Sequence, residues 1–560
     1  MTHAPVSDEQ PGGVLDAIVV GAGFAGMYMV HRLREQGMSV HGFEAGDSVG
    51  GTWDWNRYPG ARCDSESMYY SYSFLPELEQ EWPLQERYPG QPEILRYLEH
   101  VADHLDLRKD FTFNARVTSA EYDEAANRWT VRMQDGTQAS ATYLVTAVGC
   151  LSTANKPQFP GADRFAGRSL HTGDWPHEPV DFTGLRVGVI GTGASGIQAI
   201  PVIAEQAAHL TVFQRTAQFT IPAANGPLDP QLAGLWKQNY PEWRRRGRFS
   251  QGGIPYTVSA MSALDVSAAE RRAAFEAAWD QGGFMFAQGT FYDLVISEEA
   301  NQHVADFVRS KIDEIVADPA VAQMLKPTTF PFGTKRLPLD TNYYQTFNRP
   351  NVSLVDLRAT PIEEITPAGI TTAAGEHELD VIVYATGFDA LTGPLFALGI
   401  RGRGGQALAD AWAEGPRTYL GLAVPGFPNL LTITGPGSPS VLSNMPVSIE
   451  QHVEWISDCL AWLRDHEIDT IEATPDATSS WTDHVQDVAS HTLFPKAASW
   501  YMGANIPGKP RLFLPYIGGV GNYRVRCDAV AANGYEGFTV AGTSEGSGGD
   551  GARPGDDRAA

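Results

Sequence analysis

One glycine-rich pattern occurs twice in this sequence, and that repetition restricts the possible folds more than any other feature. The pattern stands as Gly21-Ala-Gly23-Phe24-Ala25-Gly26 and again as Gly191-Thr192-Gly193-Ala194-Ser195-Gly196. Each copy follows a short run of β-branched residues and precedes a segment with helical spacing. In such a strand–turn–helix unit the first glycine permits a tight turn, the second admits a pyrophosphate, and the third lets the helix pack closely. The sequence therefore predicts an α/β fold with two Rossmann-like dinucleotide-binding domains.

The residue at the end of the second strand distinguishes the two units. In the first unit the strand 39–43 leads to Glu44, whose carboxylate suits the free ribose hydroxyls of FAD or NAD. In the second unit the strand 210–213 leads to Arg215 and Thr216 instead. A guanidinium and a hydroxyl bind the 2′-phosphate of NADPH, which a carboxylate would repel. This contrast in charge predicts FAD in the first unit and NADPH in the second.

The chain has 560 residues, too many for a single hydrophobic core, so we expect several domains. The expected divisions are an FAD-binding domain over 15–150 and 388–540, an NADPH-binding domain over 151–224 and 331–387, a helical insertion over 225–330, a disordered leader over 1–14 and a disordered tail over 541–560. Within the insertion, the run Arg244-Arg-Arg246 with Arg248 is interpreted as a solvated face.

Composition excludes several classes of partner. The net charge of −25 argues against non-specific binding to nucleic acid or to an acidic membrane surface. No apolar run reaches the length of a membrane span, and the four cysteines are scattered without the spacing of metal ligands. We therefore expect a cytoplasmic protein with reduced thiols, no metal, no nucleic acid and no membrane partner, present as a monomer or a weak oligomer.

Three loops have compositions that suit a flat cofactor. Segment 50–64 combines glycines with three aromatic residues and arginines, so it can pack an aromatic ring while its backbone approaches closely. The Gly-Pro-rich segment 435–445 can lie against a flavin ring, and segment 500–508 is predicted to act as a lid. The adjacent cations Lys335 and Arg336 can reach a phosphate and a flavin, or they form an ordinary surface pair. Asp64 by itself reads most simply as a turn residue.

Between the glycine loops lies Phe165-x-Gly167-x-x-x-His171-x-x-x-Trp175-Pro176. General considerations make this a linker in which His171 is a hinge or hydrogen-bonding residue. The string also resembles the fingerprint of type I Baeyer–Villiger monooxygenases. Gly50-Gly-x-Trp53, followed by Tyr58-Pro-Gly and Asp64, resembles a second signature of that family. The resemblance spans about residues 15–540 and is closest to the phenylacetone and steroid monooxygenase branch.

The resemblance implies that the protein uses FAD, NADPH and O2 to convert a ketone to an ester or lactone through a C4a-peroxyflavin, with sulfide oxidation as a possible second activity. It implies that Arg336 stabilises the activated oxygen, a role worth ~3 kcal/mol, and that Asp64 holds Arg336. The implied flavin contacts are Thr52, Trp53, Asp54, Trp55, Tyr70, Val117 and Met445. The implied NADP contacts are Arg215, Thr216, Lys335 and Trp500. Further residues expected to bind one of the cofactors are Gly51, Arg62, Cys63, Ile197 and Gln198. Asp54 departs from the family, which often has an aromatic residue there.

Two alternatives stay open on the sequence. A related flavin monooxygenase that oxidises nitrogen or sulfur would share both cofactors, although the linker ending in Trp175-Pro176 and the presence of Arg336 favour the ketone reaction. An NADPH oxidase or a redox-sensing binding module would also retain both glycine loops. The identity of the ketone does not follow from the residues, because loops form the pocket.

Overall fold

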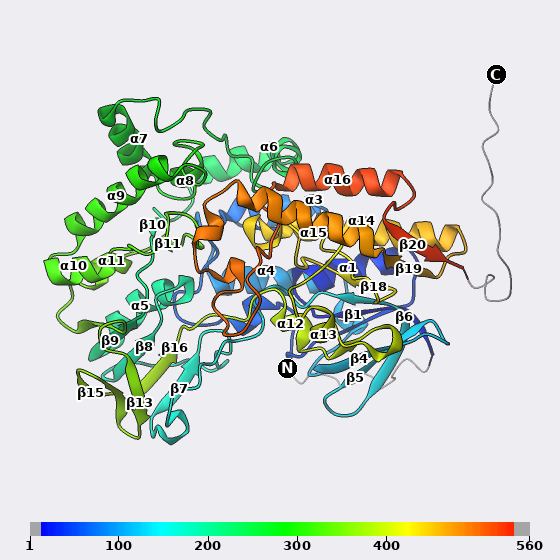
Figure 1. Ribbon diagram of the computed structural model, residues 1–560, viewed down its shortest axis with the longest axis horizontal. Helices are drawn as coiled ribbons and strands as arrows, with labels where there is room; N and C mark the ends of the chain where they lie inside the picture. Colours follow the sequence, from blue (N-terminus) through cyan, green and yellow to red (C-terminus); the bar gives the residue numbers. More distant parts are fainter. Residues whose placement is uncertain (1–12, 543–560) are drawn as a thin grey trace.

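The structure is a computed structural model that describes residues 13–542 and contains two large sheets, one mixed and one wholly parallel, in separate halves of the molecule (Figure 1). Residues 1–12 of the expected leader and 543–560 of the expected tail lie outside the described residues. Ala541 still belongs to a β-strand, so regular structure continues one residue beyond the expected end of the last domain.

The first sheet has β1 at its centre, and its order is β17-β4-β5-β6-β1-β2-β3 with β18 also paired to β6. Parallel pairing joins β1, β2, β3 and β6, whereas β4 and β5 add an antiparallel meander. The strands are β1 (Leu15–Val20), β2 (Val40–Phe43), β3 (Phe111–Thr112), β4 (Val117–Asp123), β5 (Arg128–Met133), β6 (Gln138–Thr146), β17 (Ile400–Arg401) and β18 (Leu430–Thr432). Because β17 and β18 come from the last third of the chain, the polypeptide leaves this half and later returns to it.

The second sheet is wholly parallel, with the order β12-β9-β8-β16-β7. Its strands are β7 (Arg168–His171), β8 (Arg186–Ile190), β9 (His209–Gln214), β12 (Val352–Asp356) and β16 (Val381–Tyr384). The interpretation of the Phe165–Pro176 fingerprint as a plain linker is therefore incomplete. Its central residues form the edge strand β7, because they pair with β16 in register from Arg168–Val381 to His171–Tyr384.

Smaller sheets and short helices complete the two halves. The remaining strands are β10 (Ile221–Pro222), β11 (Leu339–Asp340), β13 (Ile362–Thr366), β14 (Gly369–Thr372), β15 (Gly375–Glu378), β19 (Thr470–Ala473) and β20 (Phe538–Ala541). The helices outside the insertion are α1 (Phe24–Glu35), α2 (Thr52–Trp55), α3 (Pro76–Glu81), α4 (Gln91–His104), α5 (Ala194–Gln206), α11 (Tyr343–Thr346), α12 (Gly393–Phe396), α13 (Leu408–Ala411), α14 (Met445–Asp465), α15 (Pro475–Ser490) and α16 (Val520–Ala532), with 3-10 turns at 67–69, 108–110, 162–164, 403–405, 440–442, 494–496 and 500–502.

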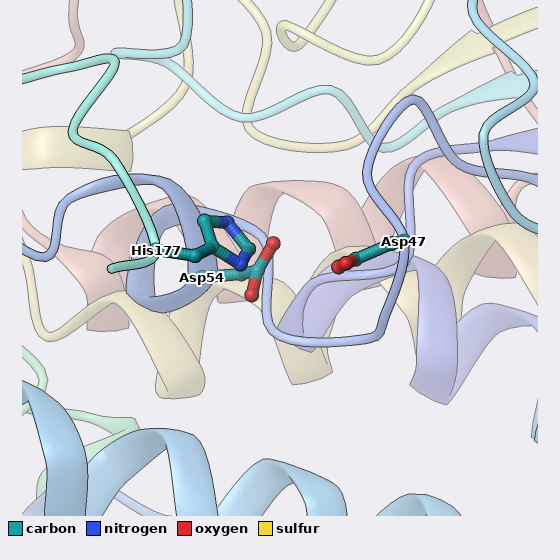
Figure 2. Close-up of side chains that lie close together, drawn as sticks. All are labelled: Asp47, Asp54 and His177. Carbon is teal, nitrogen blue, oxygen red and sulfur yellow. The ribbon is translucent and has the colours of Figure 1, made fainter.

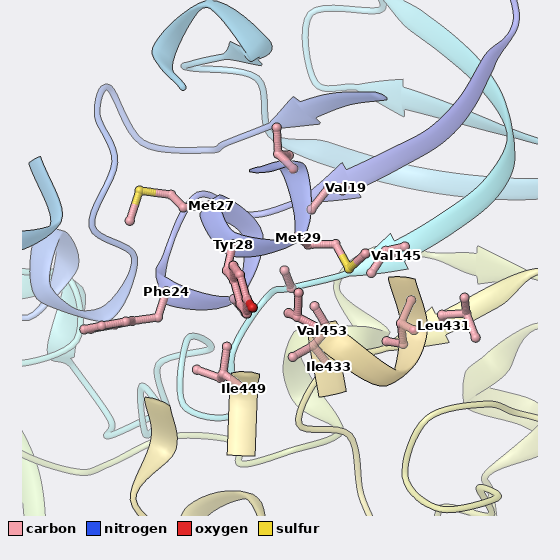
Figure 3. Close-up of a cluster of buried hydrophobic side chains, with 14 of the residues drawn as sticks. Val19, Phe24, Met27, Tyr28, Met29, Val145, Leu431, Ile433, Ile449 and Val453 are labelled. Carbon is pink, nitrogen blue, oxygen red and sulfur yellow. The ribbon is translucent and has the colours of Figure 1, made fainter. Parts of the chain in front are cut away.

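The largest core lies around α1 and fixes the position of the first glycine loop. Figure 3 shows Met29 of α1 with Val19 of β1 and Val145 of β6, and Val453 of α14 on the other side. Nearly every residue of α1 is buried, because the sheet covers one face of the helix and α14 covers the other. Burial of apolar side chains on both faces holds this helix rigidly, so its N-terminus has a fixed direction.

The insertion consists of α6 (Pro230–Arg248), α7 (Ala268–Gln281), α8 (Met285–Gln288), α9 (Glu298–Ile315) and α10 (Pro319–Leu325). The capping box from Ser267 to Glu270 forms, and α9 buries the apolar face that its spacing predicts. The interpretation of Arg244–Arg248 as a solvated face is wrong for two of the arginines. Arg244 is buried against Glu79, and Arg248 donates to Ser73, because α6 packs on α3 and α16 of the first half.

None of the helices within residues 13–542 combines the length and the apolar character that a membrane crossing needs.

Candidate functional site

A single large cavity runs between the two halves and is lined by both glycine loops. Its volume is about 1700 Å³, well above the range of roughly 300–1,000 Å³ that is usual for one small ligand. The loops after β1 and β8 and the segment around Arg336 all line it. A cavity of this size and shape has room for two dinucleotides that meet at one place.

The first glycine loop forms the part of the cavity nearest β1. Helix α1 begins at Phe24 without a side-chain cap, so backbone N–H groups at its N-terminus are left for a phosphate. A side-chain atom on Gly26 would overlap the carbonyl oxygen of Gly21, which explains the third glycine as a packing requirement. These features fit the diphosphate of a bound dinucleotide.

Glu44 follows β2 directly, lies beside this loop and is buried. Its carboxylate accepts hydrogen bonds from the backbone N–H groups of Ala22 at 2.7 Å and Gly46 at 2.8 Å. Burial raises the pKa of Glu44, and the two backbone donors oppose that rise by stabilising the ionised form. Because the carboxylate is fixed at the wall of the cavity, it is suitably placed to accept from ribose hydroxyls.

The second glycine loop repeats this arrangement at the N-terminus of α5. Gly191 and Gly196 are closely packed, since a side chain on Gly196 would meet the Gly191 carbonyl oxygen. Gly193 differs, because an added side-chain atom there would meet no protein atom within 4 Å. Gly193 lines the cavity, so the space in front of it is free for a ligand rather than needed for packing. Helix α5 likewise has no side-chain cap.

Three cations gather at the end of the second sheet. Arg215 and Lys335, which the sequence indicates, line the cavity together with Thr216, and Arg358 joins them. Burial, together with the positive charges of Arg215 and Arg358, lowers the pKa of Lys335 to about 8. Cations that repel one another in this way are relieved by an anion, so the cluster fits the 2′-phosphate of NADPH.

Arg358 is the residue that the sequence reasoning missed at this position. It follows β12, which is the parallel neighbour of β9, and β9 leads to Arg215. The carboxyl ends of adjacent parallel strands meet at one edge of a sheet, so the pairing of these two strands would have pointed to it. Arg358 also contacts Thr216 at 3.5 Å and Thr329 at 3.3 Å through its guanidinium.

Arg336 lies where the two halves meet and is tied to the first half. Its Nε donates to Asp64 Oδ2 at 2.8 Å, its Nη2 donates to the same oxygen, and its Nη1 donates to the Val441 carbonyl at 2.9 Å. Burial alone would lower the pKa of Arg336, but the Asp64 carboxylate raises it above the ordinary value. Arg336 is thus a permanently charged group with a fixed orientation at the wall of the cavity.

The aromatic loop 50–64 forms the next part of the wall. Trp53 is buried, and its indole N–H donates to the Tyr70 hydroxyl at 3.3 Å while the two rings meet edge to face. The Gln91 side-chain amide donates to the Trp53 carbonyl, which fixes the short helix α2 against α4. Rings held in this manner present a rigid apolar surface to a flat ligand.

Most of the predicted contacts line the cavity. They are Gly21, Gly23, Phe24, Ala25, Glu44, Gly51, Thr52, Trp53, Trp55, Arg62, Cys63, Asp64, Tyr70, Val117, Thr192, Gly193, Ala194, Ser195, Gln198, Arg215, Thr216, Lys335, Arg336, Met445 and Trp500. Gly26, Gly196 and Ile197 lie behind the lining, where they pack the two helices. Asp54 also stands outside the lining.

Figure 2 shows Asp54 with Asp47 and His177, which are its neighbours outside the cavity lining. Each of these three residues offers one atom that could bind a metal ion, a carboxylate oxygen or an imidazole nitrogen. These atoms all lie within 4.8 Å of one another. Asp54 is almost fully buried and pairs with Arg57, whereas Asp47 and His177 are exposed. Burial raises the pKa of Asp54, and the contacts with Arg57 oppose that rise. The carboxylate therefore already has a cationic partner within its own loop.

The linker fingerprint lies at the joint between the halves. His171 is buried, and its Nδ1 accepts from the Gly173 N–H at 2.9 Å. Its Nε2 contacts the Asn155 carbonyl at 3.3 Å and the Thr386 hydroxyl at 3.2 Å, so it touches both segments that cross between the sheets. Burial lowers the pKa of His171. These contacts favour a hydrogen-bonding hinge residue over a catalytic one, and the linker residues Phe165, Gly167, His171, Trp175 and Pro176 all stand outside the cavity lining.

The fold and the site together define a class of protein: a nucleotide-dependent flavoprotein with one Rossmann unit for FAD and another for NADPH. Both units open on one cavity, their helix N-termini face it, and a fixed arginine stands between them.

Comparison with known proteins narrows this class. A family described as flavin-binding monooxygenase-like matches residues 16–225. A Baeyer–Villiger monooxygenase of Pseudooceanicola batsensis is 46% identical over 94% of this chain and 96% of its own length. A phenazine N-monooxygenase of Lysobacter antibioticus is 44% identical over 94% of this chain and 97% of its own.

Solved structures of monooxygenases are also similar to this chain. An oxidised steroid monooxygenase bound to NADP is 53% identical, with a TM-score of 0.90 over 94% of this chain and 99% of the other. A complex of OTEMO with FAD and NADP is 43% identical, with a TM-score of 0.91 over the same shares of the two chains. The chain belongs to the type I Baeyer–Villiger monooxygenase family, and it is a flavoprotein oxidoreductase that uses FAD and NADPH.

Proposed function

We propose that this protein inserts one oxygen atom of O2 beside the carbonyl of a ketone, which gives an ester or a lactone. The observation that carries the proposal is Arg336, a permanently charged group held by Asp64 where the two nucleotide units share one cavity. A ketone becomes more negative at its carbonyl oxygen when it is attacked. A fixed cation at that place stabilises the developing charge without having to reorganise.

The two cofactors have separate binding residues. Glu44, Gly21 and the aromatic wall around Trp53 would hold FAD, and Gly193, Arg215 and Lys335 would hold NADPH. When bound, FAD supplies the ring that accepts hydride from NADPH and activates O2. The chain itself orients the two nucleotides, excludes water with buried aromatic residues and places the charge of Arg336 at their junction.

Asp64 is assigned a positioning role toward Arg336. Its Oδ2 accepts from both Nε and Nη2 of that arginine, so the planar guanidinium cannot rotate freely about its stem. The remaining donors of Arg336 are then directed by the protein. The local sequence around Asp64 indicates only a turn residue. Its positioning role depends on the contact with Arg336, which lies in a distant segment of the chain.

Oxidation of nitrogen is a second candidate, because the relative named phenazine N-monooxygenase is 44% identical to this chain. Oxidation of nitrogen and oxidation of a ketone require opposite reactivity of the activated oxygen. A soft nitrogen or sulfur atom attacks an electrophilic oxygen, whereas a ketone accepts a nucleophilic one. A cation beside the activated oxygen favours the nucleophilic form, so Arg336 supports the ketone reaction.

The test is a product analysis with the purified holoenzyme. A panel of aryl, cyclic and steroidal ketones is offered with NADPH and O2, with a phenazine and an alkyl sulfide as comparison substrates. We expect ketone-dependent NADPH consumption and formation of ester or lactone. Formation of N-oxide without any ester would favour the second candidate, and hydrogen peroxide as the sole product would indicate an oxidase.

The remaining expectations concern location and assembly. A cytoplasmic location is proposed because Cys63, Cys150, Cys459 and Cys527 are all buried free thiols. We also propose the predicted domain division and a monomer or weak oligomer. Size-exclusion chromatography with light scattering would test the oligomeric state.

A further inference from the structure

A loop of the first half is buried in the core of the second half. Tyr58 and Ala61 follow the aromatic residues of α2 in sequence, yet they pack in the hydrophobic core that α5 shares with the second sheet. Gly60 lies so close to α5 that an added side-chain atom would stand 2.3 Å from the Gln198 carbonyl oxygen. Gly60 also has a φ of +80°, which favours glycine. Contact between segment 58–62 and α5 therefore requires a glycine at this position.

The side-chain amide of Gln198 fastens this loop to α5 with three hydrogen bonds. Its Oε1 accepts from the Tyr58 hydroxyl at 2.7 Å and from the Arg62 N–H at 3.3 Å, and its Nε2 donates to the Arg62 carbonyl at 3.0 Å. Burial raises the pKa of Tyr58 to about 12, so the phenol stays protonated and remains a donor. Both polar atoms of the amide thus find partners in the other half of the molecule.

The two segments that Gln198 joins carry residues of both nucleotide sites. Gln198 lies one turn after Ala194, where α5 begins at the wall of the cavity. The loop continues from Arg62 to Asp64, which holds Arg336 through its carboxylate. The contact therefore fixes the helix that faces the NADPH phosphates relative to the flavin side of the cavity.

We propose that Gln198 is a positioning residue for hydride transfer, because its amide fixes α5 relative to the loop 58–64. Hydride transfer oxidises NADPH to NADP+ and reduces FAD. Its reacting atoms must approach to roughly 3–3.5 Å, and a displacement of about 1 Å can slow a reaction by about 10²-fold. Loss of the amide should therefore slow the transfer while the phosphate-binding groups keep their places. The inference rests on the two cofactor sites of the proposed function and not on the substrate that is oxidised.

The test compares Gln198→Met, Tyr58→Phe and the double variant with the wild-type holoenzyme. Tyr58→Phe removes a single hydroxyl, so it still provides the test if Gln198→Met does not retain FAD. Gln206→Met is the matched control, because Gln206 lies on the same helix and its Oε1 accepts from the Phe182 N–H at 3.3 Å, within the second half.

Four quantities are measured for each variant. They are the anaerobic rate of FAD reduction at saturating NADPH, the affinity for NADP+ by calorimetry, the rate of FAD reduction by dithionite, and hydrogen–deuterium exchange over 57–64. Dithionite needs no nucleotide site, so its reaction reports on the flavin alone. Exchange reports on the contact itself, independently of turnover.

Gln198→Met should lower the rate of FAD reduction at saturating NADPH by roughly tenfold or more. NADP+ affinity and the reaction with dithionite should change by less than about threefold, because neither depends on how the nicotinamide is aligned with the flavin. Exchange over 57–64 should become faster, since the Arg62 N–H loses its acceptor. Tyr58→Phe should slow reduction less, and the double variant should be no slower than Gln198→Met, because both changes break one contact. Gln206→Met should behave as the wild type.

An unchanged rate at saturating NADPH in Gln198→Met would overturn the inference, and a simultaneous fall in NADP+ affinity would show a direct contact with the nucleotide instead. Equally slow reduction by dithionite, or an equal loss in Gln206→Met, would also overturn it, since either result indicates a general disturbance of the flavin site or of α5. A wild-type enzyme that reduces FAD with NADPH but forms no ester from any ketone would instead refute the proposed function, so the two failures are distinguishable.

Discussion

At the scale of the residue, the chemistry depends on charged side chains that distant parts of the chain hold in place. Arg336 illustrates this, because its donors are directed by Asp64 and Val441, which lie hundreds of positions and about one hundred positions away in sequence. Its charge is constant over all ordinary pH values, so its contribution depends on geometry alone.

We predict that Arg336→Ala lowers ester formation by about 10²–10³-fold, the usual cost of removing one group that stabilises developing negative charge. FAD reduction by NADPH should stay within a few-fold of wild type. Ester formation by Arg336→Lys should lie between that of the wild type and that of Arg336→Ala, since an ammonium keeps the charge but not the planar fork. Stopped-flow absorbance and gas chromatography of products measure both steps. Normal lactone output from the alanine variant would remove Arg336 from the mechanism.

Lys335 should make NADPH binding dependent on pH. Its pKa in the free protein is lowered to about 8, and a bound 2′-phosphate would raise it again. Below pH 8 the ammonium is present and binds the phosphate. As pH rises through 8, the free protein loses that charge, and NADP+ affinity should fall by up to about tenfold per pH unit. Calorimetric titration of NADP+ checks this, and Lys335→Met should abolish the slope.

At the scale of the element, the two glycine loops look alike but their glycines are needed for different reasons. Gly26 is required by packing, since a side chain would overlap the Gly21 carbonyl oxygen. Gly193 faces open space in the cavity.

We therefore predict opposite outcomes for two alanine substitutions. Gly26→Ala should yield protein that is unfolded or lacks FAD, because helix α1 can no longer approach the loop. Gly193→Ala should fold and stay yellow, while its added methyl group occupies cofactor space and weakens NADP+ binding by about tenfold, or roughly 1–2 kcal/mol. Flavin absorbance of the purified variants and NADP+ titration provide the measurements. Equal flavin content in both variants would contradict this assignment.

Segment 500–509, which contains the predicted lid 500–508, is held by Lys509, whose side chain is 9% exposed and pairs with Asp389. Lys509→Met keeps the apolar stem but removes the ammonium. The free energy needed to open the segment should therefore fall by about 1–3 kcal/mol. We expect faster hydrogen exchange over 499–508 and weaker NADP+ binding, with unchanged flavin content. Exchange equal to wild type would show that other contacts hold the segment.

At the scale of the whole molecule, a buried ion pair fastens the helical insertion to the first half. Arg244 of α6 pairs with Glu79 of α3, and the two side chains are only 9% and 7% exposed. The same guanidinium donates to the Tyr69 carbonyl and the Ser71 hydroxyl, on either side of Tyr70 in the cavity wall.

Arg244→Met should lower the free energy of unfolding by about 3–5 kcal/mol, because it leaves the Glu79 carboxylate buried without a partner. The neighbouring pair Arg245–Glu242 provides the control: Arg245 is 67% exposed, so Arg245→Met should change stability by less than about 1 kcal/mol. Thermal unfolding of the two variants under identical conditions is the measurement. Equal melting temperatures would show that the buried pair is not needed.

Patterns along the chain are enough to predict the two local nucleotide-binding units and the nucleotide that each one binds. The β-branched runs, the glycine spacing and the contrast between Glu44 and Arg215 predict two Rossmann units and one nucleotide for each. These features can be recognised in the sequence because the strand, turn, helix and ribose-binding residue of each unit lie within a few tens of residues of one another. The same local reading failed for Arg244, since its burial depends on a helix that is remote in sequence.

Contacts between residues that are distant in sequence follow from the tertiary structure alone. It placed Arg358 beside Arg215 through the pairing of β12 with β9, left Asp54 outside the cavity lining, and made the central residues of the linker an edge strand. Contacts of this kind join side chains across long loops, and their geometry is fixed by packing and burial of the whole molecule. A pattern along the chain does not contain that information.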